Sequence, residues 1–160
     1  MKGGIKMRRP LADRLIDLCV RNAEKIADSW YQALLRSTRT HSYSSVPKAT
    51  CIRLAVSMYK NLGSMYFSDN PYQAVEQNLD GAGFTEDQFA RGIPLEEVVY
   101  ALILMRREIW FHSERQSIFN VPEDMYELVV GVNRVLLIFD YATYIVVAKY
   151  KEMSRKVNKA

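Results

Sequence analysis

Apolar residues recur at intervals of three and four along nearly the whole chain, which is the spacing of one face of an α-helix. The alternation of apolar and polar residues that marks a half-buried strand is absent from the sequence. All five prolines stand where these helical stretches begin. The first turn of a helix tolerates proline because the missing N–H would have no partner there. The sequence therefore predicts an all-α fold.

The same signals set the predicted boundaries of a bundle of about six helices. The predicted helices span residues 11–37, 47–67, 71–79, 85–91, 94–117 and 122–156, so the C-terminal helix is long. Residues 1–10 are predicted to form a basic tail, and residues 11–157 a single helical domain. A single domain agrees with the chain length of 160 residues, since one domain usually takes about 150.

Charge and composition predict a soluble protein. Apolar residues make up 49% of the chain and charged residues 25%, which are ordinary globular values. The net charge of +4 is concentrated at the two ends, and the body between them is mildly acidic. An acidic body disfavours nucleic acid as a partner. No apolar segment follows the N-terminal charges, so no secretory signal is predicted and the expected location is the cytoplasm.

The C-terminal helix is unusual because the stretch Val135–Ala148 is apolar or aromatic almost all round. Asp140 and Tyr144 interrupt this stretch, which we predict to be too short and too polar to cross a membrane. A surface helix needs only one apolar stripe, so the remaining faces require another cover. We predict a homodimer interface; the alternative is a central helix of a monomer. The candidate interface residues are Leu137, Tyr141, Tyr144, Ile145 and Ala148.

Two charged residues fall among apolar neighbours on separate predicted helices. Arg106 lies four residues from both Leu102 and Trp110, and Asp140 interrupts the apolar C-terminal stretch. A lone buried charge is costly, so each would need a partner. We predict an interhelical ion pair between Arg106 and Asp140, unless both side chains reach water from the edge of the apolar stripe.

Aromatic residues are the candidates for ligand binding. They make up 11% of the chain, including ten tyrosines, and tyrosine suits both the edge of a core and a small-molecule pocket. Packing in the core is the first interpretation, and a pocket for a small apolar ligand is the alternative. The residues that would line such a pocket are Trp30, Tyr59, Tyr66 and Trp110.

The sequence offers little catalytic equipment, so we predict a protein that is not an enzyme. Cys19 and Cys51 are predicted to be buried thiols. His41 is predicted to be a solvated loop residue, and His112 to stack at a helix end where the dipole favours its charged form. No metal or cofactor is expected. The alternative is haem held by His112, because an axial histidine is the usual anchor of haem in globin-like folds.

Several of these residues resemble the N-terminal domain of RsbR-type and RsbRD-type proteins, the co-antagonists of the bacterial stressosome. The resemblance covers about residues 20–150 and is carried by the run Gly92-Ile93-Pro94-Leu95-Glu96-Glu97-Val98, by Ala101, Leu102, Arg106 and Trp110, by Trp30-Tyr31 and by Tyr59-Lys60-Asn61-Leu62.

This resemblance implies a dimeric, globin-like sensor domain that usually binds no haem and serves as an input for stress signalling. The family's domains feed a C-terminal output module, and no such module follows within the 160 residues. The expected partners are therefore a second copy and an output domain or signalling protein. The family has no catalytic residues that could be carried over to this chain.

Overall fold

The computed structural model describes residues 11–116 and 125–159. Within these residues every regular element is a helix, which confirms the all-α class. The elements are α1 (Leu11–Arg21), α2 (Ala23–Arg36), the short 3₁₀-helix η1 (His41–Ser45), α3 (Lys48–Lys60), α4 (Leu62–Tyr66), α5 (Pro71–Ala82), α6 (Phe84–Ala90), α7 (Leu95–Arg115) and α8 (Met125–Asn158). The predicted long C-terminal helix is α8, with 34 residues. The basic tail at residues 1–10 lies outside the described residues.

Two of the predicted helices are each divided at an asparagine, which explains why more helices form than the sequence predicts. Asn22 separates α1 from α2, and Asn61 separates α3 from α4. The Asn22 side chain donates to the Leu18 carbonyl at 3.0 Å, and the Asn61 side chain donates to the Ser57 carbonyl at 2.9 Å. An asparagine amide that bonds a carbonyl four residues back competes with the helix and favours a local break.

Proline positions the helix starts as predicted. Pro47 and Pro94 immediately precede α3 and α7, and Pro71 is the first residue of α5. Asn70 caps α5, since its side chain accepts a hydrogen bond from the Gln73 amide at 3.1 Å. The predicted helix start at Pro122 lies outside the described residues.

Gly83 forms the turn between α5 and α6. Its φ of 64° is left-handed, which glycine adopts without steric cost. The sequence predicts this helix to start at residue 85, but α6 begins at Phe84 and Thr85 is buried inside its first turn. The left-handed turn brings the chain into α6 earlier than the side-chain pattern indicates.

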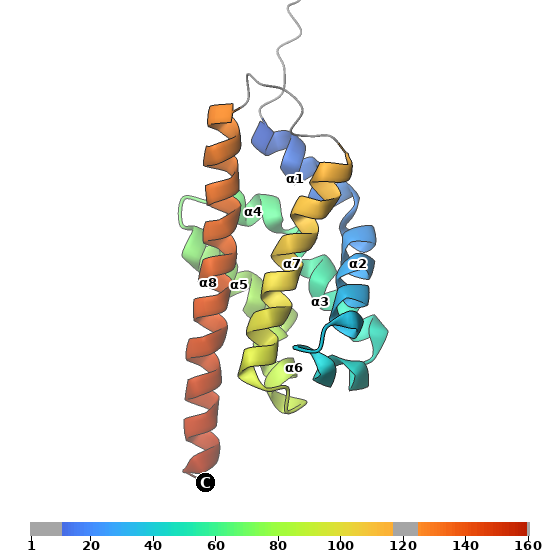
Figure 1. Cartoon of the computed structure of the whole chain (residues 1–160). Coiled ribbons are helices and arrows are strands. Elements are labelled where there is room, and N and C mark those ends of the chain that lie inside the picture. The colour runs from blue at the N-terminus through green and yellow to red at the C-terminus, as the bar shows by residue number, and fades with distance from the viewer. Residues whose placement is uncertain (1–10, 117–124, 160) are drawn as a thin grey trace, which may run out of the picture.

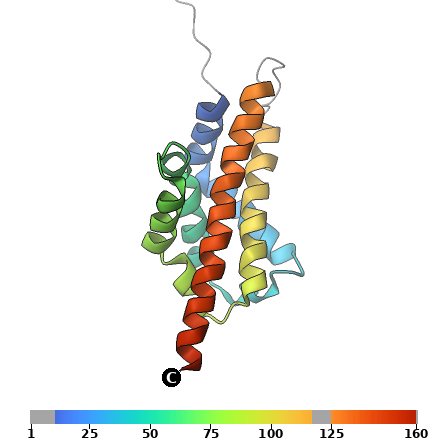
Figure 2. The same ribbon diagram turned by 90° about the vertical axis from the view of Figure 1, so that its left-hand side faces the viewer.

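The helices form two layers (Figure 1). Helix α7 packs against α2 on one side and against α8 on the other, and these three form the front layer. The second layer contains α3, which packs on α2, and α5, which packs on α8. The view turned by 90° shows α5 and α7 on opposite sides of α8 (Figure 2).

Hydrogen bonds from buried aromatic side chains fix α7 in this arrangement. The indole Nε1 of Trp30 donates to the Ala101 carbonyl at 2.8 Å, and the Tyr59 hydroxyl donates to the Met105 carbonyl, also at 2.8 Å. Both side chains are completely buried. Each ring therefore supplies apolar volume to the core, and its polar atom is satisfied by a backbone carbonyl of α7.

Gly131→Ala is expected to stabilise the protein by about 0.5–1 kcal/mol, because glycine inside a helix costs that much relative to alanine. A Cβ at this buried position of α8 would meet the Tyr66 hydroxyl at 3.6 Å, an ordinary contact. Urea denaturation measures the change. The matched control is Gly63→Ala in α4, whose Cβ would lie 3.0 Å from the Ile16 methyl. Equal gains in both variants would contradict this explanation.

Candidate interface on the outer face of α8

One stripe of α8 is packed against its own domain. The helix contacts α1, α4, α5, α6 and α7 along its length. The buried residues recur at helical spacing and form a single face: Gly131, Val135, Ile138, Phe139, Ala142, Ile145, Val146 and Tyr150. Their burial fixes which side of α8 faces the core and leaves the opposite side available.

Two basic side chains anchor α8 to the second layer. The Lys149 ammonium pairs with Asp80 of α5 at 2.7 Å and with Glu86 of α6. Further up the helix, Arg134 donates from Nε to the backbone carbonyl of Tyr66 at the end of α4. These contacts come from helices distant in sequence, and they hold α8 in one rotational setting about its axis.

The opposite side of α8, which we call the outer face, is apolar and uncovered. No other helix lies in front of it in the view from this side (Figure 2). Tyr126 is 81% exposed and Tyr144 is 64% exposed. The outer face consists of Tyr126, Val129, Val130, Asn133, Leu137, Asp140 and Tyr144. An uncovered apolar surface of this kind is typical of an interaction site.

The predicted interface residues divide between the two sides of α8. Tyr144 and Ala148 are exposed, and Leu137 and Tyr141 are half-buried. The Tyr141 ring packs edge-on against Tyr72 of α5, with centroids 5.3 Å apart. The prediction for Ile145 is wrong: it is only 5% exposed, because it lies on the stripe that packs against its own domain. Periodicity showed an all-round apolar helix but not which side its own chain covers.

The stretch Val135–Ala148 is predicted to be too short and too polar for a membrane, but the helix that contains it is longer. The helix is 34 residues long, and its most apolar 18-residue stretch has a mean hydropathy of 1.5. By length and composition alone, α8 could therefore cross a membrane. The core helix of a soluble protein passes the same test, and 39% of this stretch is buried inside the domain.

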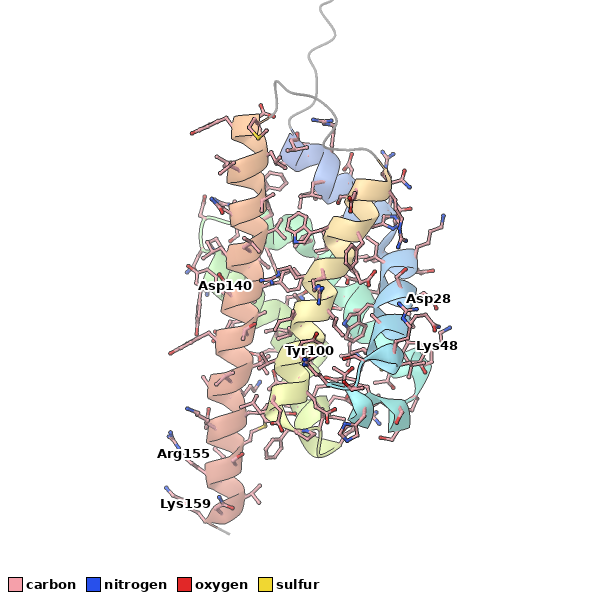
Figure 3. All side chains as sticks on the ribbon, viewed as in Figure 1. Asp28, Lys48, Tyr100, Asp140, Arg155 and Lys159 are labelled. Atoms are coloured by element: carbon pink, nitrogen blue, oxygen red, sulfur yellow. The ribbon has the colours of Figure 1, made fainter. Side chains whose placement is uncertain are left out.

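The structure does not bring Arg106 and Asp140 together. Arg106 is half-buried on α7, whereas Asp140 is exposed on the outer face of α8 (Figure 3). In the described part of the chain neither forms an ion pair with the other. Water solvates the Asp140 carboxylate on this side, so the charge has no need of a buried partner.

The four candidate ligand-binding aromatics lie in or against the core. Trp30, Tyr59 and Tyr66 are buried, and Trp110 is half-buried and packs on the same cluster. The Trp30 ring also meets Tyr43 edge-on, with centroids 6.4 Å apart. Their placement agrees with the packing interpretation, and binding of a small apolar ligand by these residues stays a prediction.

His41 has a partner that sequence reasoning missed. It is largely exposed, as predicted for a loop residue, but its Nδ1 lies 3.2 Å from the buried carboxylate of Glu97. Glu97 also accepts hydrogen bonds from the Ser42 amide and hydroxyl, each at 2.9 Å. The carboxylate of Glu97 thus holds η1 against α7, a contact between segments more than fifty residues apart in sequence.

His112 lies in the last turn of α7, as predicted, but its surroundings oppose the predicted charged form. Burial lowers the pKa of its imidazole, and the nearby cations Arg115 and Lys25 lower that pKa further. These effects oppose the helix dipole and favour the neutral ring. Haem binding by His112 stays a prediction.

Both cysteines are buried free thiols, as predicted. Burial raises the pKa of the Cys19 thiol to about 12 and that of the Cys51 thiol to about 11. Each is therefore protonated at neutral pH and is a poor nucleophile. Within residues 11–116 and 125–159, no group of three histidine, cysteine or acidic side chains is placed to hold a metal ion.

No protein-family model, curated protein or solved structure matches the chain. The resemblance to stressosome sensor domains, and the globin-like fold that it implies, therefore stay predictions.

Proposed function

We propose that the chain is a cytoplasmic bacterial regulatory domain, without catalytic activity, that works as a homodimer joined through the outer face of α8. A change in the packing of the two α8 helices would carry the signal to an output domain or partner protein. The observation that carries the proposal is the uncovered apolar surface on a helix that is otherwise fixed to its domain.

The spacing on the outer face favours another helix as its cover. Val130, Leu137 and Tyr144 follow one another at intervals of seven residues. Seven-residue spacing keeps a seam facing a partner helix in a coiled coil. A second copy of α8 supplies such a helix, and a two-fold dimer uses the same patch on both subunits. The polar Asn133 and Asp140, also seven apart, could set the register of the pair.

Lipid is a poorer cover for the same face. Asp140 is exposed near the middle of α8, where a charged side chain in a bilayer would cost about 2.5–3.5 kcal/mol. In addition, Lys149 ties the helix to Asp80 at 2.7 Å, so the inner stripe would have to leave its domain before lipid could surround the helix. A protein partner leaves the inner stripe packed on its domain.

The C-terminal end of α8 is placed to transmit a change in packing. Its last turns, which include Arg155, project beyond the other helices, and Lys159 follows directly after them (Figures 1 and 3). Among residues 151–159, all are exposed except the half-buried Met153. A shift between paired helices would therefore change the relative positions of these exposed ends. The resemblance to stressosome input domains supports a role in stress signalling.

Distance measurements between spin labels test the proposal. Ser154→Cys places one exposed thiol on the projecting end, while the two natural cysteines are buried and resist labelling. Pulsed dipolar spectroscopy of the labelled protein should give an inter-copy distance that disappears on dilution with unlabelled protein. We expect two maxima, or one that moves with temperature, since regulation requires two arrangements.

Two results would contradict the proposal. A monomer in light scattering, with no dipolar signal, would rule out the homodimer. A single narrow maximum that never moves would leave a purely structural dimer and would contradict regulation through α8.

A further inference from the structure

The described part of α7 carries two buried carboxylates in different environments. Glu97, 5% exposed, accepts two hydrogen bonds from Ser42 and faces His41. Glu108, three turns along the same helix, is 7% exposed. Within the described residues, no N–H or O–H donates to its carboxylate and no cation pairs with it. The Glu108 oxygens are not among the fully buried polar atoms that lack a hydrogen-bond partner, so they reach solvent and are free to accept from a ligand.

Glu108 lines a cleft between α2 and α7. The cleft has a volume of about 400 Å³, and α2 contributes Ser29, Gln32 and Arg36 to its walls. Helix α7 contributes Phe111 and Arg115 beside Glu108. This volume lies at the small end of the range of about 300–1,000 Å³ that ligand pockets occupy. The cleft therefore suits a small metabolite.

Both signs of charge are displayed in the cleft. Arg36 and Arg115 are exposed, and neither guanidinium has a carboxylate partner in the described part of the chain. Asp28, at the cleft edge, is already paired with Lys48 at 3.0 Å (Figure 3). The unpaired groups are thus one buried carboxylate and two guanidinium ions.

This combination selects the class of ligand. A metal ion would meet one carboxylate and two cations, and a phosphate would have to approach a buried negative charge. A zwitterion satisfies both kinds of group, because its ammonium can donate to Glu108 while its carboxylate accepts from the arginines. We propose that the cleft between α2 and α7 binds a free α-amino acid, with the ammonium on Glu108, the carboxylate on Arg36 and Arg115, and the side chain against Phe111. This site does not depend on dimerisation through α8.

Calorimetric titration with L-alanine, L-leucine, L-glutamine and L-phenylalanine tests the proposal. At least one should bind at millimolar concentration. Its N-acetyl derivative lacks the ammonium and its amide lacks the carboxylate, so each should bind at least about tenfold more weakly. Absence of binding by all four amino acids, or equal binding of a blocked derivative, would overturn the proposal.

Substitutions in the cleft locate the site. Glu108→Gln should weaken binding of the same amino acid at least about tenfold, and Arg36→Gln together with Arg115→Gln should do likewise. The matched controls are Glu114→Gln on α7 and Arg155→Gln on α8, exposed positions that do not line the cleft. Equal losses in cleft and control variants would overturn the proposal. Leu137→Lys, on the outer face of α8, should leave binding unchanged, which separates this proposal from the homodimer.

A pH profile of stability gives a second readout. Burial raises the pKa of the Glu108 carboxyl, and Arg115, Arg36 and Arg107 lower it by less. Asp28 also lines the cleft, and Tyr59 of α3 interacts electrostatically with Glu108. Because the folded pKa exceeds the unfolded one, the contribution of Glu108 to stability is present at low pH and is lost as pH rises through the folded pKa.

The variant Glu108→Gln carries an uncharged amide at this position, so its stability does not fall in this way as pH rises. The urea midpoint of this variant should therefore exceed that of the natural protein at pH 7, and the two should converge near pH 4. A saturating concentration of the amino acid should raise the urea midpoint of the natural protein and remove its difference from Glu108→Gln at pH 7. Unchanged midpoints with and without the amino acid would contradict an ammonium seated on Glu108.

Discussion

Leu137→Lys is expected to convert the dimer to a monomer at micromolar concentration. In a two-fold pair, Leu137 is buried in both copies, and burying one leucine contributes about 1.5–3 kcal/mol. The substitution also places two ammonium groups in the seam. Together these effects should weaken the dimer at least about a hundredfold, because each 1.4 kcal/mol changes affinity tenfold. Analytical ultracentrifugation over a concentration series measures the shift.

The same substitution on α2 provides the control. Leu35 is also a partly exposed leucine in a helix, but α2 does not pack against α8. Leu35→Lys should therefore leave the dissociation constant unchanged. In the Leu137 variant, circular dichroism should show retained helix, since the lysine stem can lie along the half-buried surface. Equal weakening by both substitutions would show that the outer face of α8 is not the interface.

Trp30→Ala is expected to destabilise the protein by about 3–5 kcal/mol, the usual cost of truncating a buried tryptophan. The ring is completely buried, contacts Tyr43, and holds α7 through its 2.8 Å hydrogen bond to the Ala101 carbonyl. Urea denaturation at fixed protein concentration measures the loss, since dimerisation makes stability concentration-dependent. Thermal unfolding followed by circular dichroism provides an independent check.

Two further variants separate the sources of this loss. Trp30→Phe keeps an aromatic ring but loses the indole N–H, and it should cost less than the alanine substitution. Tyr59→Phe removes only the hydroxyl that bonds the Met105 carbonyl, and it should cost about 1 kcal/mol. A negligible loss in Trp30→Ala would instead favour the alternative in which Trp30 lines a ligand pocket, because a pocket wall contributes little to packing.

The boundaries of the helices show how far local sequence signals reach. Pro71 and Asn70 start α5 as predicted, because capping involves only the residues of the first turn. The spacing of apolar residues predicts one continuous helix across Asn22 and another across Asn61, but the structure breaks both helices at these residues. Periodicity records which residues are apolar, whereas these breaks depend on an amide bonding the chain four residues earlier. An asparagine inside an apolar period is not enough to locate such a break, since Asn133 lies within the unbroken α8.

The candidate sites show where local reasoning ends. Arg106 and Asp140 were paired because each lies among apolar neighbours, but rotation of α8 about its axis places Asp140 on the outer face. Glu97 and Glu108 look alike in sequence. Within the described residues, however, Glu97 accepts hydrogen bonds from Ser42, which lies 55 residues away, whereas Glu108 has no such donor. The cleft beside Glu108 could not be predicted, because its walls come from α2 and α7, two helices that are far apart in the sequence.

The sequence by itself determined the all-α class, most of the proline-marked helix starts, the two buried thiols and the all-round apolar character of the C-terminal helix. These properties depend on residues within a turn or two of one another. Only the tertiary structure decided which side of α8 is covered, and that Glu108 lines a cleft between α2 and α7. Burial and pairing depend on atoms that other helices bring from far along the chain, so no local pattern encodes them.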